Sequence, residues 1–204
     1  MRGDATSRFD ACIACGGVAL FPADTVYGLA CDPEDPAAIE RLYAVKGRTP
    51  EKAAAVMFFA LPRALEALPE LGPGTRVALT RLLPGAVTLL VPNPGRRFPL
   101  TCRADPDTLG VRVVDVPELR GAGCAVLQSS ANRSGEPPPR RLGDVIPEIR
   151  RRVELTVDGG ELPGVASTVV DLRQYESEGR WRVVREGAVN PEDLSAALVS
   201  SSGR

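Results

Sequence analysis

Three basic residues lie close together in the segment LYAVKGRTPEK (residues 42–52), which contains Lys46, Arg48 and Lys52 and a single acidic residue. A glycine and a proline in the same segment favour a bent connection over a helix. Such a cluster is either a solvated charged turn or a phosphate clamp, in which arginine makes two parallel hydrogen bonds to a phosphate and lysine acts as a point charge. Because Lys52 directly precedes the apolar run at 53–59, and does not lie on a polar helix face, its position favours the clamp.

Polar residues also follow several apolar runs, at the points where strands are expected to end. Thr25 follows FPAD, Ser130 and Asn132 follow CAVLQ, and Ser167 follows a glycine-rich stretch. Hydroxyl, amide and backbone N–H groups at strand ends can bind an anion or a carboxylate. The alternatives are a capped turn into a short helix at Thr25 and an ordinary surface loop at 128–141, although three prolines restrict that loop and favour a preorganised site.

Two arginines, Arg112 and Arg185, lie among β-branched residues in strand-like runs. A guanidinium group in such a setting needs a partner, which can be an internal carboxylate or an anionic ligand. The P-loop pattern G-x-x-x-x-G-K-[ST] does not occur in the sequence, so ATP would bind without a Walker motif.

The composition excludes several kinds of site. The chain has no histidine, which rules out Ser-His-Asp triads, Cys-His dyads and histidine-ligated zinc. Cys12 and Cys15 form the one C-x-x-C among five cysteines, and we expect buried thiols there, with redox or metal chemistry as the alternative. With 25 basic and 26 acidic residues, the gross charge predicts no nucleic-acid or membrane partner. Without a membrane-length apolar run or a signal peptide, we expect a cytoplasmic protein.

Short apolar runs alternate with capped or proline-led segments, which predicts one α/β domain. We expect strands at 18–23, 53–59, 86–92, 108–114, 124–128, 155–160, 167–172 and 181–187. We expect helices from Thr6 or Ser7 to Gly16, from Asp35 to Gly47, near 62–70, 74–83 and 142–152, and after Pro191. We divide the chain into a lead-in (1–8), one domain (9–189) and a C-terminal helix and tail (190–204).

The order of the motifs resembles that of the YrdC family. PADTVYGLACD, LYAVKGRTPEKAAAVM, LLPGAVTLLVP, TLGVRVVD, SSANRSGEPPP, a DGG…STVVDL stretch and VVREG follow one another from about residue 9 to 189. Several independent motifs in one order make this match specific, whereas any one of them alone would be weak. The resemblance implies the short, single-domain form of the family, with a twisted mixed sheet, flanking helices and a large basic concavity.

The resemblance also implies an activity. Members of the family are nucleotidyltransferases that condense L-threonine, bicarbonate or CO2, and ATP into L-threonylcarbamoyladenylate and pyrophosphate. ATP would carry Mg2+, and no protein ligand to a metal is implied. A threonylcarbamoyl-transferase complex would then modify the adenosine beside the anticodon of tRNA.

The family's functional positions can be matched residue by residue. Lys46, Arg48 and Lys52 match catalytic positions. The positions around ATP match Arg48, Lys52, Thr108, Asn132, Arg140 and Arg185, and the positions around threonine match Thr25, Arg112, Ser130 and Ser167. By this match the three cations of the opening segment would face the triphosphate.

One departure and two alternatives remain. Met57 stands where family members commonly have a histidine near threonine, and a thioether cannot donate a hydrogen bond, so the details of threonine binding stay open.

One alternative function is a carbamoyladenylate-forming carbamoyltransferase module, which usually belongs to a longer chain. The other is a non-catalytic protein that binds tRNA or double-stranded RNA through Arg140, Arg141 and the arginine run at 150–152.

Overall fold

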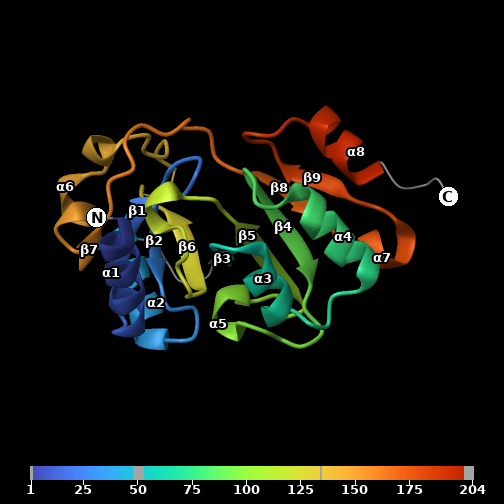
Figure 1. Ribbon diagram of the computed structural model, residues 1–204, viewed down its shortest axis with the longest axis horizontal. Helices are drawn as coiled ribbons and strands as arrows, with labels where there is room; N and C mark the ends of the chain where they lie inside the picture. Colours follow the sequence, from blue (N-terminus) through green and yellow to red (C-terminus); the bar gives the residue numbers. More distant parts are fainter. Residues whose placement is uncertain (1, 48–52, 134, 200–204) are drawn as a thin grey trace.

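Nine strands form one mixed sheet in residues 2–47, 53–133 and 135–199, the parts of the chain that the computed structural model describes (Figure 1). Their order across the sheet is β7-β1-β2-β6-β3-β5-β4-β8-β9. The pairs β7–β1, β3–β5 and β4–β8 are parallel, and the other neighbours are antiparallel. The strands are β1 (Ala19–Pro22), β2 (Tyr27–Cys31), β3 (Ala55–Phe58), β4 (Val87–Pro92), β5 (Thr108–Val113), β6 (Val126–Ser130), β7 (Leu155–Thr156), β8 (Thr168–Asp171) and β9 (Arg182–Arg185).

The helices lie around this sheet, with the two ends of the described chain on opposite sides of the molecule (Figure 1). They are α1 (Arg2–Ala14), α2 (Pro36–Lys46), α3 (Leu61–Ala67), α4 (Pro73–Leu82), α5 (Pro99–Cys102), α6 (Pro147–Arg150), α7 (Tyr175–Glu178) and α8 (Pro191–Val199), with short 3-10 turns at Pro117–Leu119 and Leu142–Asp144. The predicted α/β fold with a mixed sheet and flanking helices is confirmed.

Helix α2 shows how local sequence sets an element. The Asp35 side chain accepts hydrogen bonds from the backbone N–H groups of Ala37 and Ala38, at 2.8 and 3.2 Å, and Pro36 occupies the first helical position. The helix ends where Gly47 adopts a left-handed backbone with φ 59°. Both limits agree with the prediction, and they fix where Lys46 lies.

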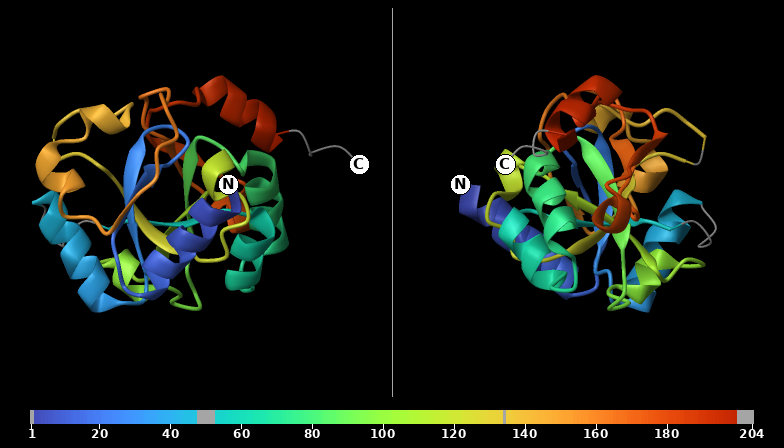
Figure 2. Two further views of the ribbon diagram at one scale, coloured as in Figure 1. Left: turned by 60° about the vertical axis from the view of Figure 1, so that its left-hand side comes forward. Right: turned by 90° about the vertical axis from the view of Figure 1, so that its right-hand side faces the viewer.

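The half of the sheet that contains β5, β4 and β8 has one apolar face and one polar face. Val87, Leu89 and Val91 of β4, like the alternate residues of β5, pack in one core with α3, α4 and α8. The residues between them, such as Thr88 and Leu90, point to the opposite side and line a cavity. Figure 2 shows α3, α4 and α8 gathered against one side of this half.

The other half of the sheet is covered on both faces. Phe9 and Ile13 of α1 pack on one face, and Ile39 and Leu42 of α2 pack on the other. Strand β3 lies between the halves, and its side chains Val56 and Met57 belong to two different cores, as the continuous apolar run predicted.

Some element predictions need correction. Tyr27–Cys31 is a strand that pairs with β1 in a hairpin, and not a short helix after a capped turn, so Thr25 lies in a hairpin turn. The first helix begins at Arg2, ahead of the predicted caps Thr6 and Ser7, and runs across the boundary that we drew at residue 8. The helix predicted at 142–152 is a 3-10 turn followed by the four-residue α6. No helix in the described part of the chain is long and apolar enough to cross a membrane.

A buried hydroxyl joins the hairpin to a distant loop. Tyr27 is fully buried, and the single proton of its hydroxyl has two acceptors within reach, Asp158 Oδ1 at 2.8 Å and the carbonyl oxygen of Gly160 at 2.9 Å. The same hydroxyl oxygen accepts from the backbone N–H of Gly159 at 3.0 Å. Burial and the neighbouring Asp158 carboxylate raise the pKa of Tyr27 to about 12. The segment 158–160 is therefore anchored beside the turn that carries Thr25.

We predict that Tyr27→Phe lowers the free energy of unfolding by about 1–3 kcal/mol, because the change leaves the polar groups at 158–160 without their partner. Urea denaturation measures this loss. Tyr175→Phe is the matched control: within the described chain the Tyr175 hydroxyl makes one hydrogen bond, to the carbonyl of Leu198 at 3.1 Å, and we expect a loss of about 1 kcal/mol or less. Equal losses in the two variants would show that the buried network adds no stability.

Candidate active site

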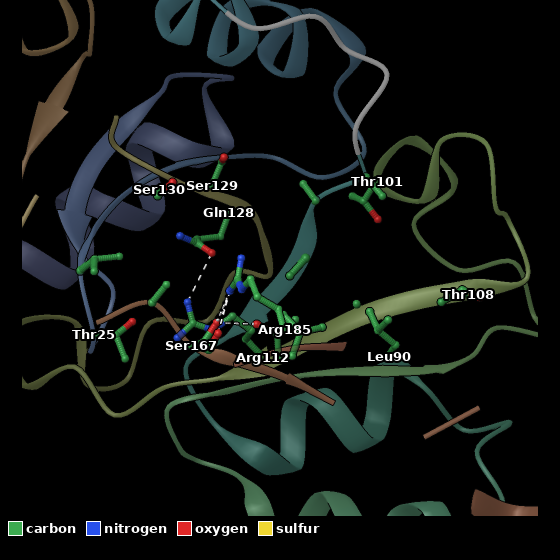
Figure 3. A pocket seen from close by; sticks show the side chains of 18 of the residues that line it. Thr25, Leu90, Thr101, Thr108, Arg112, Gln128, Ser129, Ser130, Ser167 and Arg185 are labelled. Atoms are coloured by element: carbon green, nitrogen blue, oxygen red, sulfur yellow. Dashed lines mark hydrogen bonds between the residues drawn. The ribbon is translucent and has the colours of Figure 1, made fainter. Parts of the chain in front are cut away.

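A cavity of about 670 Å³ lies over the polar face of the sheet (Figure 3). Its floor consists of small residues, including Ala53, Ala54, Ala55 and Gly110, and its walls are mainly hydroxyl, amide and guanidinium side chains. Seven predicted site residues line it: Thr25, Thr108, Arg112, Ser130, Asn132, Ser167 and Arg185. They come from the hairpin turn, β5, the end of β6 and beyond, the start of β8, and β9.

The Arg112 side chain lies at one end of the cavity and is only 4% exposed. Its Nη2 donates to Asp24 Oδ1 at 2.7 Å and its Nη1 donates to Gln128 Oε1 at 3.4 Å. The same Asp24 oxygen accepts the backbone N–H of Thr25, and Asp24 has the left-handed φ of 63°. The Nε atom of Arg112 is buried without a hydrogen-bond partner among the described residues. This end therefore retains an unused cationic donor.

A second guanidinium group approaches the same end. Arg185 Nη2 donates to the carbonyl of Ser167 at 2.7 Å and to its hydroxyl at 3.3 Å, and that hydroxyl is 2.8 Å from the hydroxyl of Thr88. Burial, followed by the positive charge of Arg112, lowers the pKa of Arg185. Two cations that repel each other make this end favourable for an anion.

The other end of the cavity lies four residues away along β5, about 13 Å at the usual strand rise. Here Arg173 Nη1 donates to Thr108 Oγ1 at 3.3 Å and lies 3.6 Å from a carboxylate oxygen of Asp105. Asp171 holds Arg173 in a fork, with Nε and Nη2 at 2.9 and 2.7 Å from its two oxygens, and also accepts from Arg182. These contacts lower the pKa of Asp171 to about 2, mainly through Arg173.

The end of β6 forms a third side of the cavity. Lys46 Nζ donates to the backbone carbonyl of Ser130, and the lysine is 2% exposed. Asn132 Nδ2 donates to the carbonyl of Glu136, whereas Asn132 Oδ1 is buried and accepts no hydrogen bond within the described residues. The lysine thus supports the backbone that carries Ser130 and Asn132.

Several predicted residues lie elsewhere. Lys46 and Arg140 do not line the cavity, and Arg140 pairs with Glu161 at 2.9 Å. Arg48 and Lys52 lie outside the described residues, so their part in the site stays a prediction. Met57, which stands at the family's histidine position, is fully buried in the core beside α1 and is not among the lining residues.

Gln128 and Arg173 are among the lining residues that were not assigned to the site from the sequence. The run CAVLQ gave a weak signal for Gln128, because it places an amide at the end of an apolar strand. For Arg173 the signal was the D-x-R spacing with Asp171 directly after a buried strand, which allows the local ion pair at 2.7 Å. Both roles depend on neighbours across the sheet, which the sequence alone does not reveal.

The arrangement suits an elongated anionic ligand. Within the described residues the lining carries three arginines and one aspartate, and it is rich in hydroxyl groups. No cluster of three or more His, Cys, Asp or Glu side chains that could hold a metal occurs in the part of the chain that the structure describes.

A family model described as "Telomere recombination", Sua5/YciO/YrdC, matches residues 11–187. The chain belongs to this family. A threonylcarbamoyl-AMP synthase of Chromohalobacter salexigens is 38% identical over 168 residues, which cover 79% of this chain and 89% of that protein.

Solved structures of the family have the same fold as this Sua5/YciO/YrdC protein. Sua5 of Pyrococcus abyssi, solved in complex with L-threonine, matches with a TM-score of 0.82 and 25% identity, covering 97% of this chain and 58% of that one. YciO of Escherichia coli matches with a TM-score of 0.77 and 21% identity, covering 95% of this chain and 94% of that one. The chain therefore spans a little over half of the P. abyssi protein and nearly the whole of YciO, and the predicted resemblance to the family is confirmed.

We predict that Asp171→Asn weakens the pH dependence of stability in acid. The folded-state pKa of Asp171 lies near 2, below its ordinary value of 3.8, so the carboxylate stabilises the fold above about pH 4 and loses this effect as the pH falls toward 2. Urea denaturation at pH 5 and pH 2.5 should show a smaller fall in the variant than in the wild type. Asp193→Asn, an exposed carboxylate on α8, is the control, and an equal fall in all three proteins would refute the prediction.

Proposed function

We propose that this protein is a threonylcarbamoyl-AMP synthase, which condenses L-threonine, bicarbonate or CO2, and ATP into L-threonylcarbamoyladenylate and pyrophosphate. The observation that carries the proposal is that seven positions matched to the family's substrate-binding residues line one cavity. Membership of the Sua5/YciO/YrdC family and the 38% identity to a threonylcarbamoyl-AMP synthase support it.

The amino acid would bind at the Arg112 end. Its carboxylate would meet the guanidinium groups of Arg112 and Arg185, with the hydroxyls of Thr25 and Ser167 nearby. The relative solved in complex with L-threonine supports this assignment. ATP would extend from there along the cavity toward Thr108, and Arg48, Lys52 and Arg140 would contribute from outside the described lining.

The chemistry requires positioning more than a protein nucleophile. The amine of threonine adds to CO2 and loses a proton, which gives a carbamate; a carbamate oxygen then forms a bond to the α-phosphorus of ATP, and the bond to the β-phosphate oxygen breaks. Fixed lysine and arginine side chains stabilise the charge that grows on the phosphoryl oxygens. A site without histidine can perform these steps, because no covalent enzyme intermediate is needed.

Mg2+ would enter with ATP, since this ion is commonly held by substrate phosphates and only one or two carboxylates. A threonylcarbamoyl-transferase complex would consume the product and modify tRNA, and we expect the protein to work in the cytoplasm.

One assay tests the proposal. The protein is incubated with ATP, Mg2+, bicarbonate and threonine, and pyrophosphate release is measured with each substrate omitted in turn. We expect release that requires both threonine and bicarbonate. Release without threonine, or only with carbamoyl phosphate, would instead indicate the carbamoyltransferase alternative, and tRNA binding without any release would indicate the RNA-binding alternative.

We predict that Arg48→Ala and Lys52→Ala each lower kcat about 100- to 1,000-fold, the usual loss for one preorganised donor to a charged transition state. The melting temperature should change little. Arg63→Ala, which removes an arginine 64% exposed on α3, is the control and should retain full activity. A variant that loses stability together with activity would show that its cation supports the fold and does not bind phosphate.

A further inference from the structure

The amide of Gln128 lies beside Arg112 inside the cavity (Figure 3). Gln128 belongs to β6, where it pairs with Ala30 on one side and Ala55 on the other, and it is 8% exposed. Its Oε1 accepts from Arg112 Nη1 at 3.4 Å. Because a guanidinium group only donates, the amide oxygen must face Arg112, which leaves the amide nitrogen for another partner.

That nitrogen has no hydrogen-bond acceptor among the residues that the structure describes. It lies directly over Gly28 of β2, where the Cβ of any larger residue would approach it to 2.7 Å, so glycine provides the space that it occupies. Within the described residues this nitrogen is not sealed by protein atoms, so a ligand in the cavity can reach it. Arg112 Nε is also unpaired within the described residues, but protein atoms cover it, so the amide nitrogen is the more accessible of the two donors.

The charge at the Arg112 end of the cavity indicates which kind of ligand would supply the hydrogen-bond acceptors. Asp24 already compensates Arg112, and the second cation, Arg185, has no carboxylate among its hydrogen-bond partners in the described chain. One further negative charge would balance the pair. A ligand with a carboxylate and, close to it, a neutral oxygen would satisfy both the guanidinium groups and the amide N–H.

We propose that Gln128 determines which amino acid the protein selects, by donating a hydrogen bond from Nε2 to the side-chain hydroxyl of a β-hydroxy amino acid whose carboxylate is bound at Arg112. This inference rests on the proposed function and adds the group that distinguishes threonine from valine, its isostere without the hydroxyl. Gln128 would therefore contact the substrate through Nε2. Its other contact, from Oε1 to Arg112, orients the amide so that Nε2 can reach the substrate hydroxyl.

Calorimetric titration of the protein with L-threonine and with L-valine tests this role without depending on turnover. We expect the wild type to bind threonine at least about tenfold more tightly than valine, since a site built to bond a hydroxyl rejects the analogue that lacks it. In Gln128→Met, which retains the length of the side chain but cannot donate, we expect the preference to fall to about twofold or less.

Gln128→Glu separates the two contacts. Glutamate retains an acceptor for Arg112 but has no N–H, so the threonine preference should again be lost although the arginine remains bonded. The control is Gln174→Met. Gln174 is the chain's other glutamine, and it is exposed and lies outside the cavity, so this variant should retain the wild-type preference for threonine. Melting temperatures and circular dichroism spectra identify any variant that does not fold, and either Gln128 variant alone decides the question.

The possible outcomes are distinct. An equal loss of affinity for threonine and valine in both Gln128 variants would mean that the amide only positions Arg112, and it would overturn the inference. A wild type that binds the two amino acids equally, or neither, would overturn it as well. The pyrophosphate assay distinguishes these results from a failure of the proposed function, because a wild type that releases pyrophosphate with threonine confirms the function whatever Gln128 does.

Discussion

The ion pair between Asp24 and Arg112 is the interaction on which the site depends. Removing a guanidinium group from water is costly unless a charged partner and further hydrogen bonds compensate for it. Asp24 supplies the charge at 2.7 Å, and Gln128 supplies a second acceptor. Because Asp24 also accepts the backbone N–H of Thr25, one carboxylate joins the hairpin turn to the middle of the sheet. The left-handed backbone of Asp24 is maintained by these contacts, since a residue other than glycine adopts it at some cost.

A second constraint explains why the cavity exists. Strands β4 and β5 bury Leu89 and Val111 under α3, α4 and α8, and in the described part of the chain the opposite face of these strands lines the cavity. The opposite face can therefore carry polar side chains, and small residues such as Ala55 and Gly110 leave room above it. A side-chain carbon at Gly110 would lie 3.4 Å from the backbone of Ala55, so a larger residue would reduce this space. One face of these strands therefore stabilises the fold through its apolar core, and the other face lines the cavity.

The sequence predicted most strands because buried runs such as 86–92 and 108–114 have unambiguous limits. It missed β2, because Tyr27–Cys31 follows Pro22 and a turn so closely that a short helix was equally plausible without knowledge of the pairing with β1. For the site, strand-end hydroxyls and isolated arginines marked Thr25, Arg112, Ser167 and Arg185 as candidates beside structural alternatives, and the structure brings all four to one cavity. Gln128 and Arg173 gave only weak local signals, since their contacts with Arg112 and Thr108 join residues that are far apart in the sequence.

Lys46 is matched to a catalytic position of the family, which stays a prediction, and in the described structure its amine binds the backbone at the end of β6. The residue is the last of α2, and the helix limits set by Asp35 and Gly47 bring its amine to the carbonyl of Ser130. A lysine that is 2% exposed has few orientations available, so its main effect in the described structure is to fix the end of β6. That end carries Ser130 and Asn132 into the cavity, two strands away from Arg112. A charge near but outside the lining can therefore influence the ligand through the backbone it holds, and its electrostatic field still reaches the cavity because a protein interior screens charge weakly.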